Sequence, residues 1–210
     1  MMHPPADRLR SYAQGIADVT TRVLVEAHLS LCQTCSAAIA RAQRGARNLP
    51  PATLHDELDL PPFDCVWKAV EQATGSRRFP EAAVLPPTLL SALPHPCVWP
   101  WIVLTWPAKV RVALLIRDTE TGSELYLCHL APGSTFPRHR HVGLEENVVL
   151  EGRYQNADVR IDTGDWVIGA PGTEERSKTD DGACWCLSRI EPPGIRFGGW
   201  RRWATPFFSG

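Results

Sequence analysis

The sequence has almost no net charge and no long apolar run. Its 22 Lys and Arg residues nearly balance its 23 Asp and Glu residues, which leaves a formal charge of −1. Such a balance gives no electrostatic reason to expect nucleic acid or a membrane as a partner. No apolar stretch approaches the roughly 20 residues that a transmembrane helix needs. The first residues, 1–5, lack a basic segment followed by an apolar one, so we expect no secretion signal.

The sequence also lacks a regular cysteine framework. Its 7 cysteines are odd in number and irregularly spaced, which is typical of reduced thiols and metal ligands rather than of disulfides. We therefore expect a cytoplasmic protein. A chain of 210 residues with 44% hydrophobic content is long enough for one large domain or two small ones with a real core.

The apolar pattern changes along the chain. Helical spacing dominates residues 1–46, and a further short helix is expected from Asp64. Short β-branched or aromatic runs separated by glycine turns then indicate a barrel or sandwich; they lie at 110–116, 124–130, 147–150, 158–161, 166–170 and 184–190. We expect a helical domain over residues 1–75, with its linker beginning near residue 47. A proline-rich linker over 76–100 and a β domain over 101–204 would follow.

A histidine and two cysteines lie within eight residues, as His28-x-x-x-Cys32-x-x-Cys35. On a helix these three side chains share one face, and imidazole with two thiolates favours zinc. A tetrahedral site needs one more ligand, for which His3 is the candidate and His55 the competitor. The alternatives are a redox-active Cys-x-x-Cys pair, which usually opens a helix after a strand, or simple packing of small apolar thiols.

These residues resemble a known family. His3, the segment Leu9-x-x-Tyr12-Ala13-x-Gly15 and the His28/Cys32/Cys35 motif are similar to the N-terminal domain of zinc-containing anti-sigma factors of the ChrR type. The resemblance implies that His3, His28, Cys32 and Cys35 hold a structural zinc. It also implies that the helical domain binds an extracytoplasmic-function sigma factor and blocks its docking on RNA polymerase. The implied stimulus is oxidative stress such as singlet oxygen.

A second cluster, His139-x-His141-x-x-x-Glu145, lies in the β region. Residues two apart on a strand share a face, so both histidines can point into a barrel. With Gly152, and with Gly164-Asp165 and Pro171-Gly172 further on, this order resembles the two cupin motifs. Glu175 stands where such cupins usually have another histidine, so the expected ion is zinc, manganese or iron. Two alternatives stay open: Glu146 instead of Glu145 as the ligand, and Glu174 with Glu175 as a solvated pair.

The predicted fold is therefore α+β and multidomain, with a small zinc-stapled helical bundle followed by a cupin (double-stranded β-helix) barrel. The predicted function is a zinc-dependent anti-sigma factor, not an enzyme, whose cupin is a metal-binding sensor module. The apolar stripe of Leu9, Tyr12, Ile16, Val19 and Val23 would bind the sigma factor. The alternative is a metal-dependent, dioxygenase-like cupin enzyme with an accessory helical domain.

Overall fold

The computed structural model describes residues 1–46, 99–105, 109–199, 204–205 and 208. Three helices come first: α1 (Ala6–Ala13), α2 (Val19–Leu31) and α3 (Gln33–Ala46). The predicted helical character of this region is thus confirmed. The short helix expected from Asp64 and nearly all of the expected linker over 76–100 lie outside the described residues.

Helix α2 begins at a side-chain cap and ends where the chain becomes extended. Asp18 precedes the helix, and its carboxylate accepts a hydrogen bond from the Thr21 amide at 3.0 Å, which satisfies one of the free amides of the first turn. At the other end Cys32 adopts an extended conformation with ψ of 101°. The backbone therefore turns between α2 and α3, and this turn places Cys32 and Cys35 beside His28 rather than along one continuous helix.

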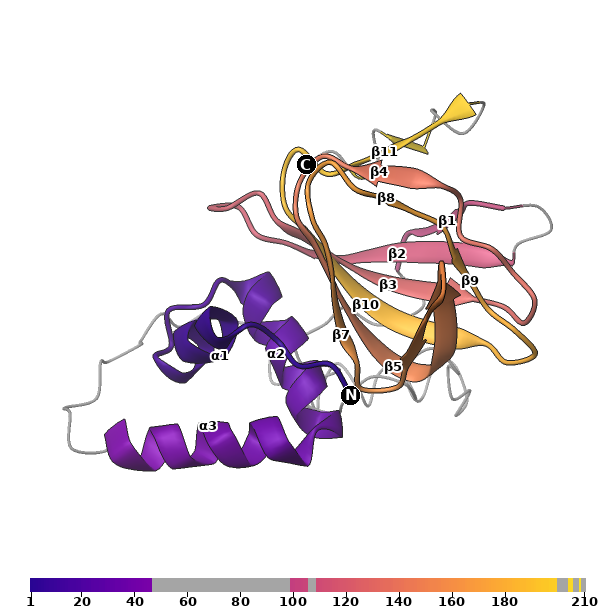
Figure 1. Ribbon diagram of the computed structural model, residues 1–210. Helices are drawn as coiled ribbons and strands as arrows, with labels where there is room; N and C mark the ends of the chain where they lie inside the picture. The colour runs from indigo at the N-terminus through magenta and orange to yellow at the C-terminus, as the bar shows by residue number, and fades with distance from the viewer. Residues whose placement is uncertain (47–98, 106–108, 200–203, 206–207, 209–210) are drawn as a thin grey trace, which may run out of the picture.

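Eleven strands follow in the described chain. They are β1 (Trp101–Val103), β2 (Val110–Arg117), β3 (Glu124–Leu130), β4 (His139–His141), β5 (Glu145–Asn156), β6 (Val159–Asp162), β7 (Trp166–Gly169), β8 (Glu174–Glu175), β9 (Ser177–Lys178), β10 (Cys184–Ile190) and β11 (Ile195–Phe197). One antiparallel sheet has the order β1-β2-β3-β10-β5-β6, with β7 and β9 also paired to β5. A smaller sheet has the order β11-β4-β8. Together they form the predicted cupin-like barrel (Figure 1).

The core has two parts, one on each side of the main sheet. Side chains alternate along the strands, so neighbouring residues of β3 contribute to different clusters. The inner cluster fills the barrel, with Val112, Tyr126, Leu130, Val149, Ile161 and Phe197 among its members. The outer cluster joins α2 to the barrel wall and includes Val23, Leu24, Val25 and Ala27 with Leu125, Leu127, Val148 and Leu187. Trp99, at the end of the expected linker, also packs there.

The apolar stripe that was expected to bind a partner is largely packed within the chain, against α2 and the barrel wall. Val23 is 4% exposed within the outer cluster, and Leu9 and Tyr12 pack against the same cluster. Within this stripe, Ile16 is the one exposed side chain, with 72% of its surface accessible. The surplus of apolar residues on these short helices thus has a docking role within the chain.

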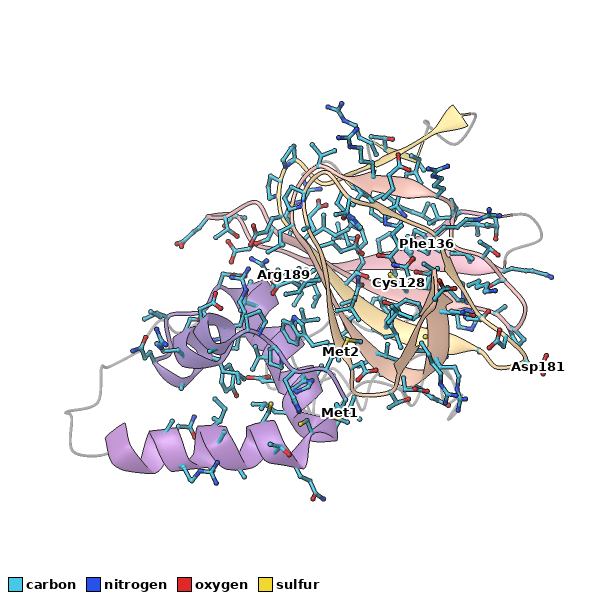
Figure 2. The ribbon with its side chains drawn as sticks, viewed as in Figure 1. Met1, Met2, Cys128, Phe136, Asp181 and Arg189 are labelled. Atoms are coloured by element: carbon cyan, nitrogen blue, oxygen red, sulfur yellow. The ribbon has the colours of Figure 1, made fainter. Side chains whose placement is uncertain are left out.

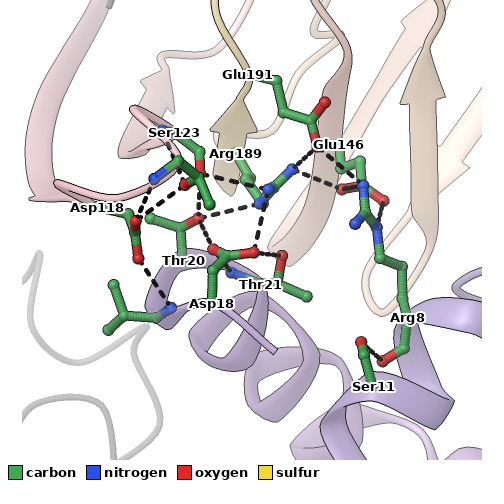
Figure 3. Close-up of polar contacts among 12 residues, drawn as sticks. Arg8, Ser11, Asp18, Thr20, Thr21, Asp118, Ser123, Glu146, Arg189 and Glu191 are labelled. Atoms are coloured by element: carbon green, nitrogen blue, oxygen red, sulfur yellow. Dashed lines mark hydrogen bonds and ion pairs between the residues drawn. The ribbon is translucent and has the colours of Figure 1, made fainter. Parts of the chain in front are cut away.

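A buried polar network accompanies this apolar contact (Figure 3). Arg189 of β10, 3% exposed, reaches Asp18 at 3.2 Å and Glu146 at 3.1 Å. It also donates to the Thr20 hydroxyl at 3.0 Å, and Arg8 of α1 contacts Glu146 at 3.0 Å. Buried ion pairs contribute little net stability, but they fix one arrangement because any misfit leaves a charge unpaired. The network therefore connects α1 and the residue before α2 to β5 and β10 through buried ion pairs.

Candidate metal centres

The first cluster gathers all four residues that were proposed from the sequence. Each residue offers one donor atom, and these four atoms all lie within 4.8 Å of one another; the residues are His3, His28, Cys32 and Cys35. Nδ1 of His3 is 3.5 Å from Sγ of Cys32 and 3.3 Å from Sγ of Cys35. A tetrahedral zinc with ordinary bond lengths separates a nitrogen from a sulfur by about 3.6 Å. The competitor His55 lies outside the described residues.

The chemistry of this donor set also fits a metal ion. His28 is fully buried, and within the described residues neither of its ring nitrogens has a well-directed hydrogen bond. Burial and the adjacent Cys32 thiol raise the pKa of Cys35 to about 11. Unpartnered buried donors are costly on their own, and a divalent cation would satisfy the imidazole and favour the thiolates. A pairing of the two sulfurs as a disulfide is not found, since both cysteines are free thiols.

The barrel takes part in building this first centre. Met2, next to His3, donates its amide to Asp165 Oδ1 at 2.6 Å, and its carbonyl accepts from the Trp166 amide at 3.0 Å. The His28 ring meets the Trp166 indole edge-on at 6.0 Å. Figure 2 shows Met1 and Met2 where the helices meet the barrel. The segment that carries His3 is therefore held by the loop before β7.

The second centre lies inside the barrel and unites β4, β5 and β8. Nε2 of His141 is 2.9 Å from Oε2 of Glu145 and 3.8 Å from Oε2 of Glu175. Nε2 of His139 is 3.5 Å from the same Glu145 oxygen. All four side chains are buried. The structure thus brings together the two histidines and both carboxylates that were singled out from the sequence.

The hydrogen bonds of the two imidazoles fix which nitrogen faces the cluster. Nδ1 of His139 lies 3.0 Å from the Pro137 carbonyl, which can only accept. Nδ1 of His141 lies 2.9 Å from the Thr173 hydroxyl, whose proton goes to the Ala170 carbonyl at 2.6 Å. Both Nδ1 atoms are therefore donors, which leaves the two Nε2 atoms, next to the carboxylates, as the nitrogens that could bind a metal ion. Among the described residues, neither Nε2 atom has a well-directed hydrogen bond, and both have the carboxylate of Glu145 as their neighbour.

Strand alternation separates the candidate carboxylates. Glu145 faces the histidines, whereas Glu146 points to the other side of β5 and joins Arg189 and Arg8. Likewise Glu175 faces inward at 8% residue exposure, whereas Glu174 is exposed and pairs with Arg138. The two inward carboxylates affect one another: burial and the charge of Glu145 raise the pKa of Glu175. Such repulsion is relieved by a bound cation.

A small cavity of about 30 Å³ adjoins the cluster and contains groups that the sequence did not single out. Asn147 donates to Glu145 at 3.1 Å and accepts from Ser188, while Ser177 donates to Glu175. These contacts orient the carboxylates as outer ligand partners do in metal sites. Each of these three residues has a charged neighbour in the sequence, as Ser177 does in Arg176 and Lys178. No local pattern therefore marks them, and their role follows only from the fold.

Three thiols lie near this cavity. Cys184 and Cys186 of β10 are buried, as expected, and Cys128 of β3 is directly opposite Cys186 in the sheet register. Figure 2 shows Cys128 and Phe136 inside the barrel. The contact with Cys186, together with burial, raises the pKa of Cys128 well above its ordinary value. Burial likewise raises the pKa of Cys186, and protonated thiols at these two positions are consistent with a packing role.

Comparison with known proteins agrees with this geometry. The family described as "ChrR Cupin-like domain" matches residues 93–192. The anti-sigma-E factor ChrR of Cereibacter sphaeroides is 27% identical over 214 residues, which cover 95% of this chain and 94% of that protein. A crystal structure of Rhodobacter sphaeroides SigE in complex with the anti-sigma ChrR matches with a TM-score of 0.63 and 24% identity, covering 90% of this chain and 98% of that chain. The predicted resemblance is thereby confirmed, and so is the predicted order of a small helical bundle followed by a cupin-like domain.

Among the described residues no single helix is long and apolar enough to cross a bilayer. Helix α2 and the part of α3 up to Gln43 have enough length and apolar character only when the two are added together. A bend of 118° separates them.

Proposed function

Because this chain is similar over nearly its whole length to a ChrR anti-sigma factor and carries a ChrR cupin-like domain, we propose that it is a zinc-dependent anti-sigma factor. Its partner would be an extracytoplasmic-function sigma factor, bound in the cytoplasm. The single observation that carries this proposal is the convergence of His3, His28, Cys32 and Cys35 at the junction of three short helices. The curated relative is a regulator, which favours this function over the dioxygenase-like enzyme considered above.

In the proposed function, the four ligands hold the helices in the shape that the partner recognises. When bound there, zinc supplies a closed structural cross-link and no chemistry of its own. A unit of about 46 described residues buries little surface by itself, so such a cross-link contributes directly to its folding. Helix α3 extends away from the barrel (Figure 1), which leaves its outer side open to a partner.

The barrel is proposed as the sensor module, with His139, His141, Glu145 and Glu175 as ligands. Two imidazoles and two carboxylates form a mixed donor set that suits zinc, manganese or iron. The outer cluster and the Arg189 network join this module to α1 and α2, so a change in the barrel can reach the helices by direct contact. That the stimulus is singlet oxygen or a related oxidative stress stays a prediction of the resemblance.

The proposal is tested by co-expressing the full chain with the sigma factor encoded nearest to it. We expect a stable complex on size-exclusion chromatography. The Cys32→Ser/Cys35→Ser variant should lose about one zinc per chain and fail to retain the partner. The matched control, His139→Ala/His141→Ala, should lose the barrel ion but keep both the first zinc and the partner. Unchanged zinc in the cysteine variant would contradict the zinc site, and a zinc-loaded chain that retains no sigma factor would contradict the function.

A further inference from the structure

The small sheet β11-β4-β8 has two chemically different faces. In its register Phe197 is opposite His139, and His139 is opposite Glu175. These buried residues form the inner face, next to the barrel metal cluster. The outer face carries the alternate residues, Arg196 and Arg140 with Glu174. Figure 1 shows this sheet at the end of the barrel away from the helices.

A hollow of about 560 Å³ lies against this sheet. Three arginines line it, Arg138, Arg140 and Arg196, together with Glu174, the glycine pair 198–199, and the inner-face residues His139 and Phe197. Its size is within the range of small-molecule sites in proteins. The three guanidinium groups and one carboxylate give this face an excess of two positive charges, in a chain whose formal charge is −1.

The arrangement of these arginines is unfavourable without an anion. Arg140 and Arg196 are direct cross-strand neighbours, and like charges at such positions repel and destabilise a sheet. Glu174 is opposite Arg140 in the register, but its carboxylate is paired with Arg138, whose Nε lies 2.9 Å away. Within the described part of the chain, neither Arg140 nor Arg196 forms an ion pair of its own.

We propose that this outer face binds a small molecule through an oxyanion group, a carboxylate or a phosphate, held between Arg140 and Arg196. The guanidinium group presents a planar fork of donors that matches both anions. The anion would offset the repulsion between the two arginines and occupy the hollow beside them. Since Arg140 lies between the metal-facing His139 and His141, such a ligand would contact the same strand as the barrel cluster.

The test uses the full chain and calorimetric titration at low ionic strength. The two probes are inorganic phosphate and succinate, which distinguish a phosphate site from a carboxylate site. We expect one of them to saturate a single site, and we expect Arg140→Ala/Arg196→Ala to weaken that binding about tenfold or more. The matched control, Arg153→Ala/Arg160→Ala, removes two exposed arginines on β5 and β6 outside this hollow. This control variant should bind the probe with the same affinity as the unmodified chain.

A second measurement separates ligand binding from a structural role. Without any anion, the Arg140→Ala/Arg196→Ala variant should unfold at the same temperature as the unmodified chain or above it, because a repulsion is removed. A clearly lower unfolding temperature would mean that the arginines hold the sheet, and would overturn the proposal. Three other results would also overturn the proposal. The first is that neither probe shows saturable binding at millimolar concentration, and the second is that the control variant loses as much affinity as Arg140→Ala/Arg196→Ala. The third is that the chain binds duplex DNA but neither of the two probes.

Discussion

At the scale of single residues, Gly169 shows how a missing side chain makes room for the barrel cluster. This glycine is on β7, opposite Glu145 of β5. A Cβ atom added there would lie 2.5 Å from Nε2 of His141, and 2.6 Å from the next ring carbon. Both distances are shorter than any normal contact with a carbon atom. The imidazole can therefore keep its position only next to glycine.

We predict that Gly169→Ala displaces the His141 ring and weakens metal binding in the barrel by about tenfold or more. The substitution leaves every proposed ligand in place, so it tests the geometry rather than the donor set. Metal analysis after dialysis against a weak chelator would measure the effect. Gly182→Ala is the matched control, because a Cβ there meets no atom within 4 Å. Equal metal retention in both variants would contradict this account of the site.

Local spacing explains which site residues the sequence could reveal. His28, Cys32 and Cys35 are close in sequence, and His139, His141 and Glu145 lie within seven residues, so their proximity follows from helix and strand geometry. Arg189 contacts Asp18 across 171 positions in the chain, and no local pattern points to that pair. The sequence also singled out Glu145 and Glu175, from their spacing to the cupin glycines, and the strand register places both carboxylates beside the histidines.

At the scale of elements, helix α2 has a pH-sensitive cap. Burial would raise the pKa of Asp18, but hydrogen bonds from Thr20 and Thr21 and the charge of Arg189 lower it to about 2, against an ordinary value of 3.8. The unfolded chain therefore binds this proton at a higher pH than the folded chain does. Asp18 contributes its stabilisation above about pH 4, and that stabilisation is lost as the pH falls towards 2.

We predict that Asp18→Asn removes this part of the acid dependence. Between about pH 4 and pH 2, the free energy of unfolding of the unmodified chain should fall by about 2 kcal/mol more than that of the variant. Asparagine keeps an oxygen acceptor for the helix cap but cannot titrate. Urea titrations across this range would measure both chains, and other titrating groups and any loss of metal affect them alike. Parallel pH curves would show that Asp18 does not act in this way.

The elements differ in how well the sequence predicted them. Strands β2, β3 and β10 were predicted within one residue of their observed ends, because each is a long β-branched or aromatic run between turns. Strands β8, β9 and β11 were not predicted, since two or three residues carry no detectable period. The apolar face of α2 was visible as a pattern. However, a pattern cannot tell whether a partner protein or the chain's own barrel will cover it, and here the barrel does.

At the scale of the whole molecule, the two metal clusters are connected through paired strands. Strand β7 pairs with β5, so that Trp166 is opposite Val148 and Gly169 is opposite Glu145. One end of β7 thus lies against the barrel cluster, and its other end follows the loop that holds Met2. The Arg189 network forms a second connection, because Glu146 follows Glu145 directly on β5. We infer that the helical unit and the barrel behave as one structural body.

Asp165 is the residue at which this connection can be tested. It accepts the Met2 amide and the Asp162 amide, and it is 6% exposed. We predict that Asp165→Ala releases the segment carrying His3 and speeds zinc loss from the first cluster by about tenfold. Asp165→Asn, which keeps an oxygen acceptor, should have an intermediate effect. The measurement is the rate of zinc transfer to a coloured chelator.

Asp162→Ala, at the end of β6 next to the loop that contains Asp165, is the control, since that side chain is 45% exposed and pairs only with surface arginines in the described structure. If both alanine variants release zinc at the rate of the unmodified chain, the barrel does not help to hold the first centre. The helical unit and the barrel would then be in contact, but the barrel would not affect zinc binding in the helices.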